Sequence, residues 1–364
     1  MDLVPTIDMI GENGTALAGG AVLGMLFGFF AQKTAFCTRS AVLDLTRRRG
    51  VSAVAIWFIG FAIAILGVQM LLVQGALDVS ETRFFSTAQS LSGALFGGLV
   101  FGFGMVLARG CVSRLLVLSA SGNLRAIFTI LVTALVGSAT YDGLLVPLRD
   151  SIGGLWNTAA IGGNDLLVHA ALPQSAGLWI GIILTLCALG LTIVARLPVW
   201  KALGAMMVGL TIVGGWYFTY TLSTQVFEPI QAESLSFVRP LATTSALASG
   251  ASSAFGLDQG LLIGTILGAF AAALLSHQFR LATFSDAGSL SVVRYAIGGV
   301  LMGFGGILAV GCTVGAGLTG GSVLAVSSLI GLAAMIVGAA LCDRLVDGVR
   351  ASSQTYPLSE RLPN

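Results

Sequence analysis

The sequence predicts an all-α polytopic membrane protein with about nine transmembrane helices, short re-entrant half-helices and an inverted pseudo-two-fold repeat. Composition is the first observation behind this prediction, because 56% of the 364 residues are hydrophobic, only 9% are charged and the mean hydropathy is +0.94. A soluble domain carries about 25% charged residues, so most helices of this chain need lipid around them. The other two observations are the spacing of the apolar stretches and a duplicated glycine-rich segment.

Nine apolar stretches have the length that a helix needs to cross the hydrocarbon core, about 20 residues. They are residues 15–31, 51–77, 90–108, 123–146, 176–195, 199–219, 257–276, 290–309 and 324–345. Shorter apolar segments lie between them, at 36–47, 111–121 and 312–321. The last two are too short to cross and too apolar for ordinary loops, so we expect half-helices that enter the membrane and return. We expect one transmembrane domain over residues 1–364.

Basic residues fall mostly in one set of loops. Of the 18 Lys and Arg residues, 15 lie in alternate loops, including Arg350 and Arg361 near the C-terminus, and three lie in the other set: Arg83, Arg149 and Arg239. Positive charge favours the cytoplasmic side, so we expect the N-terminus outside and the C-terminus in the cytoplasm. The N-terminal segment has no basic region of the kind that begins a cleavable signal peptide.

The duplicated segment covers residues 97–111 and 298–312, which are identical at nine of 15 positions with an offset of 201. The two copies belong to the third and the eighth crossing, and therefore have opposite orientation. Inverted repeats of this kind, here roughly residues 15–146 and 199–346, are typical of transporters, whose substrate path lies between the repeats. Cys111 would then approach the path from the inner side and Cys312 from the outer side. The alternative is that the glycines only allow close helix packing.

Composition and motifs exclude several classes of protein. A net charge of +2 gives no reason to expect a nucleic-acid partner. Five cysteines and two histidines show no CxxC or His-x-x-x-His spacing, so we expect neither a metal site nor a cofactor. The chain has no Walker motif and does not itself hydrolyse ATP. We expect a protein that is not an enzyme.

Four motifs in order along the chain resemble the YeeE/YedE family of bacterial inner-membrane permeases for thiosulfate and related sulfur compounds. They are Gln32-Lys33-Thr34-Ala35-Phe36-Cys37-Thr38-Arg39, the Gly-Cys helix ending at Cys111, Phe279-Arg280-Leu281, and Gly311-Cys312-Thr313-Val314-Gly315. The resemblance covers nearly the whole chain. It implies a multi-pass inner-membrane permease that imports thiosulfate or a related small sulfur anion. It also makes a soluble sulfur-carrier protein of the TusA type a plausible partner at the cytoplasmic face.

By position, Cys37, Cys111 and Cys312 match the functional cysteines of the family, and Gly110, Gly311 and Thr313 flank two of them. Neutral thiols are weak hydrogen-bond donors, which suits an anion that must be bound and then released. Cys187 and Cys342 match no motif and are expected to be buried apolar residues.

Three alternatives remain open at the level of the sequence. Arg109 either anchors the inner face or attracts the anion towards Cys111. The protein could instead be a membrane thiol-redox protein, although no paired cysteine spacing is visible. It could also be a soft-metal transporter with cysteine ligands, although its methionines are scattered.

Overall fold

The computed structural model describes residues 2–226, 231–248, 250, 255–286 and 290–347, and within these residues the named elements are all helices. They are α1 (Val4–Thr34), α2 (Thr38–Thr46), α3 (Ser52–Val73), α4 (Arg83–Ser86), α5 (Leu91–Leu107), α6 (Val112–Ala120), α7 (Leu124–Tyr141), α8 (Val146–Gly153), η1 (Thr158–Ile161), α9 (Leu166–His169), α10 (Ser175–Val194), α11 (Val199–Ser223), α12 (Val238–Ala248), α13 (Leu257–Leu275), α14 (Val292–Leu308), η2 (Thr313–Gly320), α15 (Val326–Cys342) and η3 (Asp343–Asp347).

Each of the nine predicted spans is confirmed by a helix that is long and apolar enough to cross a membrane, counted over the described residues. Two boundaries differ most from the prediction. The first helix begins at Val4, well before residue 15, and bends at Gly11, where φ is 76°. The fourth ends at Tyr141, because Pro147 in the first turn of α8 starts a separate short helix. Arg350 and Arg361 lie outside the described residues.

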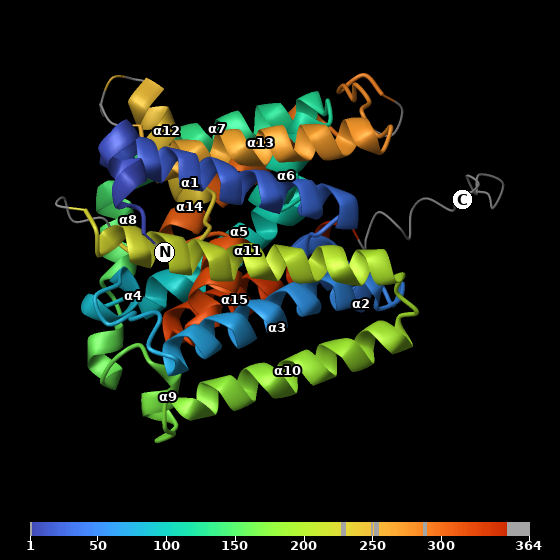
Figure 1. The fold of residues 1–364 in the computed structure, drawn as a ribbon. Helices are drawn as coiled ribbons and strands as arrows, with labels where there is room; N and C mark the ends of the chain where they lie inside the picture. Colours follow the sequence, from blue (N-terminus) through green and yellow to red (C-terminus); the bar gives the residue numbers. More distant parts are fainter. Residues whose placement is uncertain (1, 227–230, 249, 251–254, 287–289, 348–364) are drawn as a thin grey trace.

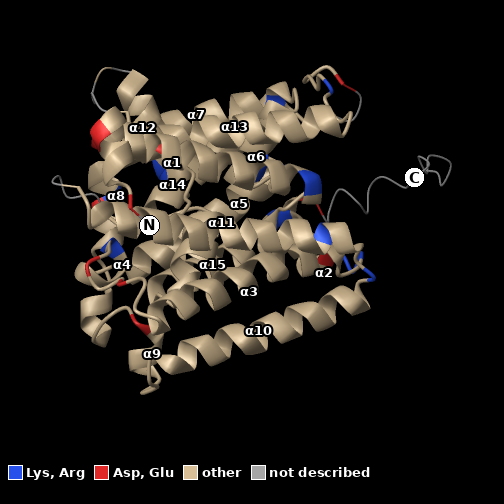
Figure 2. Cartoon of the chain, in the orientation of Figure 1, with Lys and Arg blue, Asp and Glu red and all other residues tan. Residues whose placement is uncertain are grey.

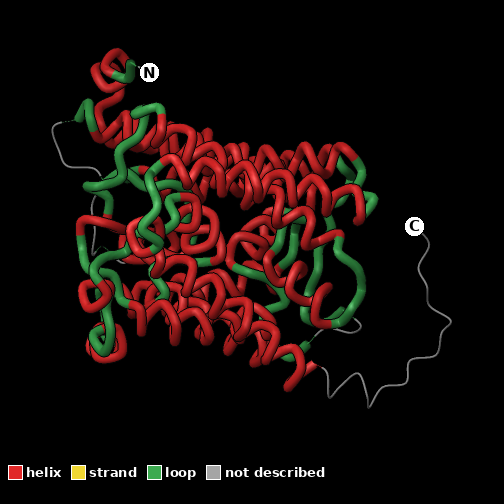
Figure 3. The backbone as a smooth tube through the Cα atoms, turned by 90° about the horizontal axis from the view of Figure 1, so that it is seen from below, coloured by secondary structure: helices red, strands yellow, loops and turns green. Residues whose placement is uncertain are grey.

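The long helices run side by side across the molecule, with α10 at one edge packed against α3 (Figure 1). Most loops gather towards the two ends of these helices (Figure 3). Charged residues follow the same division: Lys and Arg gather at the end that carries α2, and Asp and Glu mark mainly the end that carries α4, α8 and α9 (Figure 2). The uneven distribution of basic residues along the sequence therefore becomes a difference between two ends of one bundle.

Glycine determines how closely the helices approach. A Cβ atom on Gly260, Gly264 or Gly268 of α13 would lie 2.0–2.1 Å from a carbonyl oxygen of α1, and α1 presents three glycines to α13 in return. Such spacing lets two helix backbones come into contact, so much of the glycine in this chain serves close packing.

α5 and α14, the two helices of the duplicated segment, also contact each other through glycines on both helices. A Cβ on Gly97 would lie 2.8 Å from the oxygen of Gly305, and a Cβ on Gly298 would lie 3.0 Å from the oxygen of Gly104. Gly298 is 201 residues after Gly97, and Gly104 is 201 residues before Gly305, so the second pair is the first with the two helices exchanged. The two copies thus face each other through matching surfaces.

Candidate functional site

Both copies of the duplicated helix end in the same backbone break. Arg109 and Val310 occupy matching positions and have positive φ values of 59° and 64°. A positive φ is uncommon for any residue with a side chain and is strained for β-branched Val310. Each break is followed by a glycine, Gly110 or Gly311, and then by the cysteine that is the N-cap of a short helix. The breaks therefore place Cys111 and Cys312 at the start of α6 and η2.

The helices after the two cysteines are the predicted half-helices. α6 has nine residues and η2 has eight. At about 1.5 Å per residue in an α-helix, nine residues cover roughly half of the hydrocarbon core. All eight residues of η2 are buried, and most of α6 is buried too. These two segments occupy the interior of the bundle and do not cross it.

At the break before Cys111, which we name the inner break after the orientation expected from the basic residues, the structure brings together two of the predicted cysteines. The Sγ atoms of Cys37 and Cys111 lie 3.9 Å apart, and the Cys111 Sγ also lies 3.4 Å from the hydroxyl of Ser113. Cys37 is the N-cap of α2, so both sulfurs stand at helix N-termini. No pairing was visible in the sequence because 74 residues separate the two cysteines.

The third cysteine, Cys312, is fully buried at the other break, which we name the outer break after the same expected orientation. Its thiol lies beside the backbone of Phe237 and Val238. Thr313 is also buried, and within the described residues its hydroxyl has no hydrogen-bond partner. The structure thus separates the three predicted cysteines into a pair at one break and a single thiol at the other.

Other predicted residues contribute through the backbone. Arg109 is exposed, and its positive φ makes the inner break, which favours an inner-face anchor over a residue that touches the substrate. Gly110 and Gly311 are buried next to the cysteines.

Cys187 is exposed on α10, contrary to the expectation of burial, because α10 lies at the edge of the bundle. Cys342 is buried, as expected.

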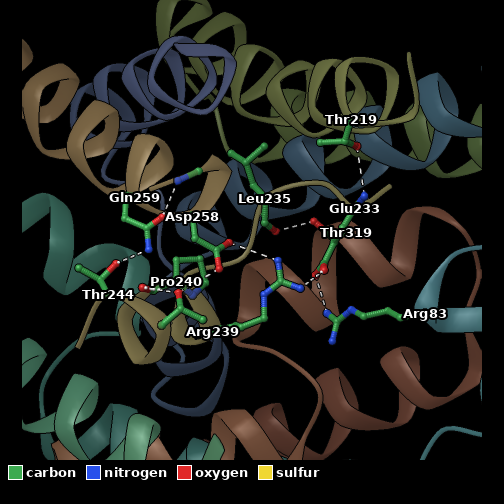
Figure 4. A network of polar contacts seen from close by, with 12 residues as sticks. Arg83, Thr219, Glu233, Leu235, Arg239, Pro240, Thr244, Asp258, Gln259 and Thr319 are labelled. Carbon is green, nitrogen blue, oxygen red and sulfur yellow. Dashed lines mark hydrogen bonds and ion pairs between the residues drawn. The ribbon is translucent and has the colours of Figure 1, made fainter. Parts of the chain in front are cut away.

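A charge cluster around the buried carboxylate of Glu233, not predicted from the sequence, lies at the end of the bundle that carries α4. Glu233 accepts from Arg83 at 2.5 Å and from Arg239 at 2.6 Å, and Arg239 also reaches Asp258 at 3.2 Å. Figure 4 shows both guanidinium groups directed at the one carboxylate. Arg83 donates in addition to the carbonyl of the strained Val310, at 3.1 Å. The cluster therefore holds the outer break in place.

Burial and charge act against each other on these groups. Burial alone would raise the pKa of Glu233, but Arg239 and Arg83 outweigh it and hold the pKa below its usual range. Glu233 in turn raises the pKa of Arg239, while burial lowers that of Arg83. The carboxylate is ionised at neutral pH, and it balances much of the positive charge that the two arginines bring to this end.

Glu233 lies in the connection between α11 and α12. Residues 232–238 are buried, residues 232–236 have no regular secondary structure, and the segment lies beside η2. Thr319 donates to the carbonyl of Leu235 at 2.6 Å, and Ser234 donates to that of Ile212 at 2.6 Å. The first bond gives a buried carbonyl of this irregular segment a partner. The sequence signal that could have revealed the segment is a lone Glu among small and apolar residues.

Two cavities lie beside the outer break. The wide one, about 690 Å³, is open and includes Arg149 and Asp150 in its wall. The narrow one, about 50 Å³, has Gly311, Arg239 and Ser236 in its wall. The two cavities adjoin, because Arg83, Tyr141, Ile307 and Val310 line both. We call these two adjoining cavities the outer funnel.

Polar groups without partners line the narrow part of the outer funnel. Among the described residues, the buried hydroxyl of Ser236 and the Nε atoms of Arg83 and Arg239 have no hydrogen-bond partner. A buried polar group left unpaired is costly, and such groups often mark a place that binds a ligand or water. The funnel therefore offers donors, and no carboxylate lines its narrow part.

A search among known proteins agrees with this architecture. A family model described as sulphur transport matches residues 33–341. The chain belongs to this sulphur-transport, or YeeE/YedE, family. One relative, the thiosulfate transporter TsuA of Spirochaeta thermophila, is 27% identical over 307 residues, covering 81% of this chain and 88% of the relative. Another, the thiosulfate transporter TsuA of Escherichia coli, is 24% identical over 366 residues, covering 91% and 94%.

The family assignment confirms the resemblance found in the motifs. The chain is a multi-pass membrane protein of a transport family and not an enzyme. Within the described residues, no group of three or more His, Cys, Asp or Glu side chains could hold a metal ion.

Proposed function

We propose that this protein imports thiosulfate, or a closely related sulfur anion, across the bacterial inner membrane. The anion enters the outer funnel, passes Cys312 and then reaches Cys111 and Cys37. The observation that carries the proposal is the narrow cavity, which has in its wall hydrogen-bond donors and Gly311, the residue before Cys312. Two curated relatives named thiosulfate transporters supply the substrate class.

The chain forms one transport domain made of two inverted repeats, roughly residues 15–146 and 199–346. Packing supports this relation: α1 lies along α13 as α11 lies along α3, and α5 packs on α15 as α14 packs on α7. α2 contacts α3 as α12 contacts α13. In this correspondence Cys111 matches Cys312, Arg39 matches Arg239, and Cys37 matches Phe237.

The end rich in Lys and Arg faces the cytoplasm, following the positive-inside rule. The N-terminus is then periplasmic and the C-terminus cytoplasmic, and the outer funnel opens to the periplasm. A TusA-like sulfur carrier would receive the imported sulfur at the opposite, basic end.

Weak binding suits the chemistry of the path. A dianion without partners is prohibitively costly in a low-dielectric interior, yet a site that binds too tightly would not release it. Arg83 and Arg239 attract the anion, and Glu233 balances part of their charge. Beyond them the donors are the Ser236 hydroxyl and the thiols of Cys312, Cys111 and Cys37, which are neutral and weak.

The test is uptake of radiolabelled thiosulfate by proteoliposomes that contain the purified protein. Cys312→Ala should lower the initial rate by at least about tenfold, or 1.4 kcal/mol, because the donor next to the narrow cavity is lost. Cys342→Ala is the matched control: it removes an equally buried thiol on α15 and should transport normally. Full uptake by Cys312→Ala, with correct insertion of both variants, would exclude a role for this thiol. Sulfate and selenite as competitors define the specificity.

A further inference from the structure

The thiol pair at the inner break has chemistry that transport of an anion does not require. Cys37 and Cys111 stand at the N-termini of two different short helices, with their Sγ atoms 3.9 Å apart. Both side chains are buried, with relative exposures of 4% and 1%. A disulfide has an S–S length of about 2.05 Å, so the sulfurs must approach by about 2 Å to be joined. Each cysteine lies at the junction of a loop and a helix, where a small shift of the backbone is possible.

None of the other cysteines is placed in this way. Cys312 has Phe237 at the position that matches Cys37, with the Phe237 ring packed on Phe27 at 5.0 Å between centroids. Cys342 lies at the end of α15, and Cys187 is exposed on the peripheral α10. All five cysteines are in the described part of the chain, and the sulfur–sulfur contact found there is that of Cys37 with Cys111.

We propose that Cys37 and Cys111 are an oxidisable pair that forms a reversible disulfide and closes the path near its cytoplasmic end. The oxidant is a hydroperoxide. One thiol, as its thiolate, attacks a peroxide oxygen, becomes a sulfenic acid and releases water or an alcohol. The second sulfur then attacks the sulfenic sulfur, the S–S bond forms and a water molecule leaves. With hydrogen peroxide, two thiols and one peroxide give one disulfide and two waters, a two-electron change.

The local structure favours this chemistry at the inner break. The first N–H groups of a helix have no partner within the helix, and they stabilise negative charge at its N-terminus. Here two such N-termini meet at the two sulfurs. The attacking thiolate and the leaving hydroxide of the sulfenic acid both carry negative charge next to these N–H groups. In this proposal small peroxides reach the buried pair along the path proposed for the transported anion.

The disulfide would stop transport for two reasons. It removes both S–H donors from the inner part of the path, and it ties α2 to α6 at the point where the chain enters the half-helix. Exchange with a cytoplasmic dithiol would reverse it, so the pair would be reduced in an unstressed cell. The loss of uptake depends on the proposed transport function, whereas formation of the disulfide does not.

The experiment uses the full chain with Cys187→Ser and Cys342→Ala, two residues outside the path, which leaves three of the five thiols. The purified protein in proteoliposomes is treated with hydrogen peroxide, denatured, and alkylated with a mass-tagged thiol reagent. We expect the number of free thiols to fall from three to one and a peptide pair joined through Cys37 and Cys111 to appear. Dithiothreitol should restore all three. Adding Cys37→Ser as a matched variant should leave both remaining thiols free after peroxide.

Uptake of radiolabelled thiosulfate is measured on the same samples. We expect a loss of more than about tenfold on oxidation and recovery with dithiothreitol, because a closed path does not conduct. Three free thiols after peroxide would overturn the proposal. A complete Cys37–Cys111 link with unchanged uptake would overturn the closing role of the disulfide. Absence of uptake by the reduced protein would contradict the proposed function, and the thiol count would still decide whether the pair is oxidisable.

Discussion

Cys111 and Cys312 occupy matching positions at the ends of two helices that pack on each other, but their surroundings differ. The inner cysteine has a second thiol 3.9 Å away, whereas the outer one lies beside the backbone of Phe237 and close to a cluster of two arginines and a glutamate. Both breaks have a positive φ two residues before the cysteine. The repeated helices thus determine where each cysteine lies. The loops that meet them, residues 36–37 and 232–237, determine its chemical environment.

The largest expected effect concerns the cluster of Arg83, Glu233 and Arg239 at the outer break. Glu233→Gln removes the buried charge that Arg83 and Arg239 share, and leaves their two half-buried guanidinium groups without it. Breaking a buried ion pair from one side costs about 3–5 kcal/mol, so we expect a clear fall in thermal stability in detergent. Asp150→Asn, an exposed carboxylate at the same end, is the control and should change stability by less than about 0.5 kcal/mol. Equal stability of the two variants would mean that the cluster does not hold the outer break.

The same cluster predicts a dependence on pH. Because the folded protein holds the pKa of Glu233 below its usual range, its ion pairs contribute fully above the pKa of the unfolded carboxyl, about 4.3. That contribution is lost as pH falls below this value towards the folded pKa. We expect the Tm of the native protein to fall between pH 5 and pH 3, and that of Glu233→Gln to fall less. Parallel curves for the two proteins would argue against this origin of acid sensitivity.

A smaller effect tests whether the contacts of matching glycines on α5 and α14 are equivalent. Gly104 and Gly305 match across the repeat, and a Cβ on either would lie 2.7–2.8 Å from a carbonyl oxygen of the opposite helix. Overpacking of this kind costs about 1–3 kcal/mol, so Gly104→Ala and Gly305→Ala should lower stability by similar amounts. Gly190→Ala, on α10 with open space around the glycine, is the matched control. A large difference between the first two variants would show that the contacts of Gly104 and Gly305 are not equivalent.

The smallest effect comes from the backbone of the two breaks. Val310→Gly should raise stability by about 1 kcal/mol, because glycine adopts a φ of 64° without strain. Arg109→Gly should gain less, since arginine is not branched at Cβ. Thermal unfolding of the two variants in the same detergent measures the difference. A gain for Arg109→Gly that exceeds the gain for Val310→Gly would contradict the role assigned to β-branching.

Much of the fold could be predicted because a lipid environment requires long apolar helices. Nine spans, two half-helices and the duplicated Gly-Cys segment follow from hydropathy, length and repetition, which are local properties of the chain. The cysteines of the site were identified from the duplicated motif and the family resemblance. The buried segment 232–237 and the outer funnel were missed, because a lone Glu in a connection between two spans does not by itself indicate that two arginines from other elements will cover it.

The sequence by itself determined that the chain crosses a membrane, which end carries the basic residues, and that two glycine-rich helices end in cysteines. These properties depend on composition and on neighbours along the chain. Only the tertiary structure decided that Cys37 meets Cys111, that Cys312 stands alone, and that Glu233 holds Arg83 and Arg239 beside it. The physical reason is that contacts between residues 74 or 150 positions apart depend on how whole helices pack, and that packing is the sum of many small contacts distributed along each helix.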